Sequence, residues 1–125
     1  MKILILDDSQ ARLDIFKKNI EQKLKVLNST DYAKTAKEAI EFLRANSDYD
    51  YIFLDHDLGG LQMEWEEDNC GMNVVDWMVR NHYPKTPSII VHSWNIPRGQ
   101  EMLKRLQDKG YSVIQHPGVW LNIGA

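Results

Sequence analysis

Five short apolar runs alternate along the chain with segments in which apolar residues recur every three or four positions. Short continuous runs are typical of strands buried on both faces, and the three-to-four spacing is typical of helices with one face on a core. Strands and helices in alternation favour right-handed crossovers, and therefore a parallel sheet with helices on both faces. We expect an α/β, doubly wound fold that forms a single domain over residues 1–125.

The boundaries of these elements are predicted from the same patterns and from capping residues. Strands are predicted at residues 2–6, 25–29, 51–54, 88–91 and 111–115, of which the second is the weakest. Helices are predicted after the cap Ser9, after the capping box of Thr35 and Glu38, over residues 72–81, and from near Pro97 to Gly110.

Composition excludes several classes of function. The net charge is −3, and no block of Lys or Arg offers the basic surface that binds duplex DNA. No apolar stretch approaches the roughly 20 residues of a membrane-spanning helix, and the first run meets Asp7 too early for a signal peptide. Cys70 is the single cysteine, which excludes an internal disulfide and disfavours zinc. We expect a cytoplasmic protein that could still bind a small nucleotide or an RNA end through a metal.

Acidic and imidazole side chains gather where the predicted strands end. Every predicted strand but the second is followed by such residues: Asp7 and Asp8, then Asp55, His56 and Asp57, then His92 with Ser93, and finally His116. The carboxyl ends of parallel strands share one edge of a sheet, where doubly wound folds bind their ligands. The sequence therefore predicts one site that collects carboxylates and imidazoles from four segments.

Each of these positions also has an ordinary structural interpretation. An Asp after a strand is often a turn former or a helix cap, and a buried His can be a core residue with a satisfied hydrogen bond. A metal site explains all the strand ends at once, whereas the structural interpretation must be repeated at each. Asp8 and Asp55 would also be like charges held close together, which costs stability without a cation. Carboxylate ligands favour Mg²⁺ or Mn²⁺, and a histidine ligand would widen the choice to transition metals.

Residues near these strand ends could bind the rest of a phosphorylated ligand. Ser93 and Asn95 offer neutral donors for phosphate oxygens. Trp94 could stack on a base or sugar, although core packing is the more common use of tryptophan. The acidic segment of residues 59–71 is either a solvated loop or a lid, in which Trp65 could stack on a ligand ring.

The sequence resembles the receiver domains of response regulators over nearly its whole length. The resemblance is carried by Ile3-Leu4-Ile5-Leu6-Asp7-Asp8, Phe53-Leu54-Asp55, Ser93 and His116-Pro117. It implies a flavodoxin-like, five-stranded sheet of order 2-1-3-4-5, a Mg²⁺ site at Asp7 and Asp8, a phosphoryl acceptor at Asp55 and a phosphate-binding hydroxyl at Ser93. Three departures stand out, because His116 replaces the usual lysine, the segment after Asp57 is longer than usual, and no fifth helix follows.

Two motifs resemble a narrower group, the cyclic-phosphate processing receivers of phage, mobile-element and RNA-repair contexts. They are Leu54-Asp55-His56-Asp57-Leu58-Gly59 and His92-Ser93-Trp94-Asn95. This resemblance implies processing of a terminal 2′,3′-cyclic phosphate or a related nucleotide, in the cytoplasm of a bacterial or phage-infected cell. Members often carry an arginine soon after the first acidic pair, for which Arg12 is the nearest candidate.

The leading hypothesis is a metal-dependent phosphoesterase that uses Mg²⁺ or Mn²⁺ to process a cyclic phosphate, a small nucleotide or an RNA end. The expected metal ligands are Asp7, Asp8, Asp55 and Asp57. The expected catalytic residues are Asp55, His56, His92 and His116. The expected substrate-binding residues are Arg12, Ser93, Trp94 and Asn95. Two alternatives stay open: a non-catalytic module that sequesters a nucleotide or is phosphorylated on Asp55, and a degenerate interaction domain.

Overall fold

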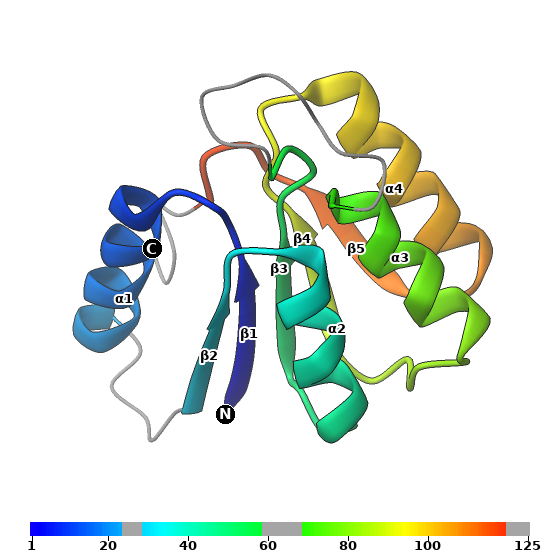
Figure 1. Ribbon diagram of the computed structural model, residues 1–125, viewed down its shortest axis with the longest axis horizontal. Coiled ribbons are helices and arrows are strands. Elements are labelled where there is room, and N and C mark those ends of the chain that lie inside the picture. Colours follow the sequence, from blue (N-terminus) through cyan, green and yellow to red (C-terminus); the bar gives the residue numbers. More distant parts are fainter. Residues whose placement is uncertain (24–28, 59–68, 120–125) are drawn as a thin grey trace.

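One parallel sheet forms the centre of the protein (Figure 1). The computed structural model describes residues 1–23, 29–58 and 69–119. In spatial order, the strands are β2 (Ser29–Ala33), β1 (Lys2–Leu6), β3 (Tyr51–Leu54), β4 (Ser88–Val91) and β5 (Ser112–Gln115). Every pair of neighbouring strands is parallel. The predicted α/β fold with strand order 2-1-3-4-5 is therefore confirmed.

Helices cover both faces of the sheet (Figure 1). They are α1 (Gln10–Lys23), α2 (Ala36–Ala45), α3 (Gly71–Arg80) and α4 (Ile96–Asp108). The helix α1 packs on one face through Leu13, Phe16 and Ile20, whereas α2, α3 and α4 share the core of the other face. Between β5 and Val119 the described chain forms no fifth helix, as expected. In the described residues, no helix combines the length and apolarity needed to cross a membrane.

Side-chain caps set the starts of three helices. The Ser9 hydroxyl accepts from the amide three residues ahead over 3.3 Å, and the Thr35 hydroxyl does the same over 3.1 Å. Both predicted caps are therefore confirmed. The fourth helix begins just before Pro97, because the Asn95 side chain accepts from the amide three residues ahead over 3.3 Å. That helix ends before Gly110, which has a φ of 89° that suits glycine.

The second strand of the described sheet lies further along the chain than the strand predicted at residues 25–29. The strand β2 begins at Ser29, where the predicted strand ends, and pairs with β1 from Lys2↔Ser29 to Leu6↔Ala33. Residues 25–28 lie outside the described part of the chain. Because β2 is an edge strand with only Ala33 buried, it carries polar residues that a search for apolar runs passes over.

Candidate functional site

The hydrogen-bond ladder of the sheet aligns the residues that follow the strands. The amide of Asp7 donates to β2 over 3.0 Å, and the amide of Asp55 donates to β1 over 3.1 Å. The amides of His92 and His116 donate to β3 and β4 over 2.9 and 2.8 Å. The backbone therefore carries the side chains that follow β1, β3, β4 and β5 to the same edge of the sheet.

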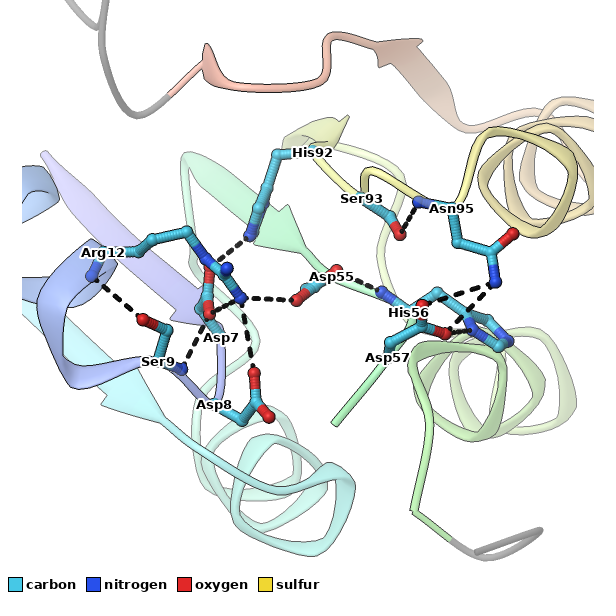
Figure 2. Close-up of polar contacts among 10 residues, drawn as sticks. All are labelled: Asp7, Asp8, Ser9, Arg12, Asp55, His56, Asp57, His92, Ser93 and Asn95. Atoms are coloured by element: carbon cyan, nitrogen blue, oxygen red, sulfur yellow. Dashed lines mark hydrogen bonds and ion pairs between the residues drawn. The ribbon is translucent and has the colours of Figure 1, made fainter. Parts of the chain in front are cut away.

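Asp7 is fully buried, and hydrogen bonds occupy both of its carboxylate oxygens (Figure 2). Its Oδ1 accepts from the Ser9 amide over 2.9 Å and from Arg12 Nη2 over 2.7 Å. Its Oδ2 accepts from Arg12 Nε over 2.8 Å and from His92 Nε2 over 3.1 Å. Burial alone would raise the pKa of Asp7, but the bonds from His92, Arg12 and Ser9 outweigh it and lower the pKa to about 2. Asp7 is therefore ionised at neutral pH, and hydrogen-bond donors inside the protein compensate its charge.

His92 lies beside Asp7, at the edge of the sheet where the sequence predicts that imidazoles and carboxylates gather. For Asp7 to accept this hydrogen bond, Nε2 must carry a proton. The imidazole packs edge-on against Phe16, with ring centroids 5.3 Å apart. Its Nδ1 is buried and has no hydrogen-bond partner within the described part of the chain. His92 thus joins the acidic cluster, but it points at a carboxylate rather than into open space.

Arg12 places a positive charge among three carboxylates (Figure 2). Its Nη2 lies 2.7 Å from Asp7 Oδ1, 3.4 Å from Asp8 Oδ1 and 3.4 Å from Asp55 Oδ2. The hydrogen bond to Asp7 raises the pKa of Arg12 and outweighs the opposite effect of burial, and the charges of Asp55 and Asp8 raise it further. The arginine expected to bind substrate is therefore also the internal counter-ion of the acidic residues.

Asp55 is also buried, but fewer hydrogen bonds compensate the charge of its carboxylate than compensate that of Asp7. Its Oδ1 accepts from the His56 amide over 2.8 Å, and its Oδ2 faces Arg12 at 3.4 Å. Burial raises the pKa of Asp55 to about 6, and the Asp7 charge adds to this rise, whereas the charges of His92 and Arg12 oppose it. A divalent cation beside Asp55 would stabilise the charged carboxylate.

Asp57 lies at the rim of the site, with its side chain 55% exposed. Its Oδ1 lies 2.7 Å from His56 Nδ1, and Asn95 Nδ2 donates to its two oxygens over 3.3 and 3.4 Å. The Ser93 hydroxyl accepts from the Asn95 amide over 3.1 Å, which fixes that oxygen beside the same rim. Contacts from the end of β3 and the start of α4 therefore orient Asp57 (Figure 2).

Cys70 belongs to this rim, although sequence analysis gave it no functional role. It is the N-cap of α3 and forms an isolated bridge with Asp57. Burial lowers the pKa of His56, but its hydrogen bonds with Cys70 and Asp57 outweigh burial and raise it. For Cys70, burial raises the pKa, but the hydrogen bond with His56 and those with the backbone of Asn73 and Met72 together outweigh burial and lower it. No spacing in the sequence indicates this contact, because it depends on how α3 returns to the sheet.

A cavity of about 510 Å³ opens in front of the carboxylates. It is lined by Asp8, Ser9, Arg12, Asp55, Asp57, Ser93 and Trp94. The Trp94 side chain is largely exposed, and its indole lies against Gly118. A Cβ on Gly118 would come within 3.0 Å of the indole, so this glycine allows the ring to lie close to the backbone. The cavity thus combines carboxylates, a guanidinium, hydroxyls and an aromatic ring.

The structure does not bring His116 into this cluster. Its side chain is exposed, its Nδ1 lies 3.3 Å from the neighbouring Pro117 carbonyl, and it does not line the cavity. The reason is local, because the imidazole turns toward the backbone of its own neighbour, Pro117, at the exposed surface. The suggested lid, with Trp65, lies outside the described residues apart from residues 69–71.

The side chains of this edge fit a divalent cation. Asp7, Asp55 and His92 offer ligand atoms that all lie within 4.8 Å of one another. Asp8 shares Arg12 with Asp7 and Asp55, whereas Asp57 contacts His56 and Asn95. Carboxylate oxygens suit Mg²⁺ or Mn²⁺, and the poorly compensated Asp55 is the observation that favours a bound cation.

Solved structures of receiver domains share this fold. The receiver domain of Francisella response regulator 1452 has a TM-score of 0.63 and 21% identity, covering 91% of this chain and 82% of that chain. A CheY-like receiver domain protein of Methanospirillum hungatei JF-1 has a TM-score of 0.62 and 16% identity, covering 98% and 86%. The RcsB response regulator of Salmonella typhimurium has a TM-score of 0.61 and 22% identity, covering 92% of this chain and 52% of that chain. At these identities the likeness shows the fold alone.

The family of this chain is shown by its match to a family model. No curated protein matches this chain. The family model for the cyclic-phosphate processing receiver domain matches residues 2–108, which span β1 to α4. The matched range contains every residue that lines the cavity. The chain therefore belongs to the family of cyclic-phosphate processing receiver domains.

Proposed function

We propose that this domain is a metal-dependent phosphoesterase that opens the cyclic phosphate of a small nucleotide or an RNA end. The observation that carries the proposal is the cavity in which Asp8, Asp55 and Asp57 face Arg12 and Ser93. Carboxylates suit a cation, whereas a guanidinium and a hydroxyl suit phosphate oxygens. The cavity therefore offers partners for both a metal ion and a phosphate.

The cavity needs an added cation before it can accept a phosphate. Among the described residues that line it, Arg12 is the one positively charged side chain, and Asp8, Asp55 and Asp57 repel an anion. A divalent cation held by Asp8 and Asp55, with or without Asp7, would neutralise phosphate charge and lower the pKa of a bound water. The proposed cofactor is Mg²⁺ or Mn²⁺.

The remaining steps fall to the side chains of the chain itself. The Arg12 guanidinium and the Ser93 hydroxyl bind the non-bridging oxygens of the phosphate. Asp57, held by His56 and Asn95, is placed to accept a proton from the attacking water. The oxygen of water bonds to phosphorus, one of the two ring P–O bonds breaks, and the released ribose oxygen takes up the proton that Asp57 accepted, which returns Asp57 to its ionised form.

Two further residues support this reaction from outside the phosphate position. His92 donates to Asp7 and so keeps that carboxylate in place, which makes it a positioning residue. Trp94 offers an exposed ring at the cavity on which a base can stack. His116 lies outside the cavity and has no part in the proposed reaction.

The test is hydrolysis of nucleoside 2′,3′-cyclic monophosphates by the purified protein with Mg²⁺ or Mn²⁺, followed by ³¹P NMR. We expect the wild type to release a linear phosphomonoester and Asp55→Asn to lose about 100-fold or more in rate. The matched control is Asp108→Asn, at the exposed end of α4, which should keep wild-type turnover. No product from the wild type with either metal, or equal rates for wild type and Asp55→Asn, would contradict the proposal.

A second candidate is a non-catalytic receiver module that is phosphorylated on Asp55. The observation that favours it is that Asp55, after β3, and Ser93, after β4, line the same cavity. These are the positions that the receiver resemblance assigns to the phosphoryl acceptor and its hydroxyl partner. Incubation with acetyl phosphate and Mg²⁺ should then add one phosphoryl group to the wild type and none to Asp55→Asn, as measured by intact mass. An unmodified wild type would exclude this candidate.

A further inference from the structure

Arg12 occupies the place among the acids that a bound cation would take (Figure 2). A single nitrogen, Nη2, contacts Asp7, Asp8 and Asp55. These are the carboxylates to which the proposed function assigns the metal. A guanidinium and a divalent cation compete for the same carboxylates, because two positive charges held a few ångströms apart repel each other.

The fold holds Arg12 in this position. The Ser9 amide donates to Asp7, and the Ser9 hydroxyl accepts from the Arg12 amide, so the first turn of α1 is tied to the end of β1. Arg12 reaches back from that turn, and 29% of its side chain is exposed. Its charge is therefore anchored at the site by local structure.

The contacts of Arg12 fall into two classes. Those to Asp7 are short, at 2.8 Å from Nε and 2.7 Å from Nη2. Those to Asp8 and Asp55 are both 3.4 Å, beyond the usual range of strong charge-assisted hydrogen bonds. The contacts to Asp8 and Asp55 are thus the ones that a competing cation can replace at least cost, while Arg12 stays attached to Asp7.

We propose that Arg12 is a built-in counter-cation that competes with a divalent metal for Asp8 and Asp55. This inference rests on the proposed function for the existence of the metal site. Without metal, Nη2 partly compensates the two carboxylates. When metal binds, it takes Asp8 and Asp55 from Nη2 while the two short bonds to Asp7 stay, and the guanidinium hydrogens that faced those carboxylates can donate to phosphate in the cavity. Arg12 therefore limits metal affinity and makes its own donors available to phosphate once metal is present.

The experiment is a calorimetric titration of the full chain with Mn²⁺, without substrate and at fixed ionic strength. Arg12→Gln should bind Mn²⁺ at least tenfold more tightly than the wild type, because the competing charge is gone. Arg12→Lys keeps a charge that cannot span the three carboxylates, so its affinity should lie between the two. The matched control is Arg80→Gln, at the exposed end of α3, which should stay within twofold of the wild type.

Thermal unfolding of the same proteins gives a second readout. Without metal, Arg12→Gln should melt at a lower temperature than the wild type, because the carboxylates lose their counter-ion. Saturating Mn²⁺ should raise the melting temperature of Arg12→Gln by more than it raises that of the wild type.

The outcomes separate this inference from the proposed function. If Arg12→Gln and the wild type bind Mn²⁺ equally, or the variant binds it more weakly, the inference is wrong and the metal-dependent function stands. If neither protein binds Mn²⁺, both are wrong. If Arg12→Gln does not fold, Arg12→Lys decides, because an affinity no tighter than that of the wild type would overturn the inference.

Discussion

The site contains two groups of polar residues. They differ in how fully hydrogen bonds and opposite charges within the protein compensate their own charges. The inner group is Asp7, Arg12 and His92, and the outer group is Asp57, Ser93, Asn95 and Trp94. In the inner group Asp7 has no exposed surface and accepts four hydrogen bonds. In the outer group Asp57 is mostly exposed, and the cavity is open beside it. Asp7 and His92 are buried like core residues, whereas Arg12 and the outer residues Asp57, Ser93 and Trp94 line the cavity where a ligand can bind.

Asp55 lies between the two groups and shows what separates them. Asp7 and Asp55 are both buried carboxylates at the ends of neighbouring strands. Burial acts to raise the pKa of both, yet that of Asp7 falls to about 2 and that of Asp55 rises to about 6. The difference is the set of donors, because short bonds surround Asp7 whereas Asp55 faces Arg12 only at 3.4 Å. Burial alone therefore does not decide whether an acid is structural or reactive.

The largest expected effect is on the inner group. Asp7→Ala removes the partner of a partly buried guanidinium and of a buried imidazole, so it should lower the free energy of unfolding by about 3 kcal/mol. Asp57→Ala removes only exposed contacts and should lower it by less than about 1 kcal/mol. Urea unfolding at pH 7 with EDTA measures both. Equal losses for the two variants would show that the inner and outer groups do not differ in this way.

The next largest effect is expected on the pH dependence of stability, through the carboxylate of Asp55. Its pKa in the folded protein, about 6, lies above the ordinary value of 3.8, so the folded state binds the proton more tightly than the unfolded state. The stability of the wild type without metal should therefore fall as pH rises from about 4 to about 6. Asp55→Asn cannot titrate, so at pH 8 it should be more stable than the wild type by roughly 2 to 3 kcal/mol.

The check is a series of urea unfolding curves across this pH range in EDTA. Asp108→Asn, at an exposed position, is the control and should keep the pH dependence of the wild type. A pH dependence that survives in Asp55→Asn would assign it to another group.

A smaller effect tests how the outer group is built. Asn95 uses its side-chain oxygen to cap α4 and its side-chain nitrogen to hold Asp57. Asn95→Ala loses both and should lower the free energy of unfolding by about 1 kcal/mol. Asn95→Ser keeps a capping oxygen but cannot donate as the amide does, so it should lose less than half as much stability. If both variants also lose turnover equally, the contact with Asp57 matters for activity, whereas full activity of Asn95→Ser would limit Asn95 to the cap.

The smallest effect on folding is expected at Trp94. Because this ring is 62% exposed, Trp94→Ala should change the free energy of unfolding by less than about 0.5 kcal/mol. Its effect should appear in ligand binding, where loss of one stacked base weakens affinity by about tenfold. Calorimetry with a nucleoside 2′,3′-cyclic phosphate and with glycerol cyclic phosphate separates the two contributions. Trp94→Phe should bind like the wild type, and equal loss for both ligands would argue against base stacking.

The sequence allowed most of the fold to be predicted, and the errors have a physical pattern. The strands β3 and β4 have the predicted bounds, because central strands need apolar residues on both faces. The strand β2 was misplaced because an edge strand can be polar. Among the site residues, Asp7, Asp55 and His92 come together as predicted, because each directly follows a strand. His116 also follows a strand, but its exposed side chain lies against its own neighbour Pro117 and does not line the cavity.

The sequence by itself determined the alternation of elements, the capping residues and the acids that follow the strands, because periodicity and local hydrogen bonding act over a few residues. Only the tertiary structure decided that Arg12 lies among three carboxylates and that Cys70 meets His56. The tertiary structure also decided that the pKa of Asp7 falls while the pKa of Asp55 rises. A pKa depends on the donors and charges that folding brings within a few ångströms of the group.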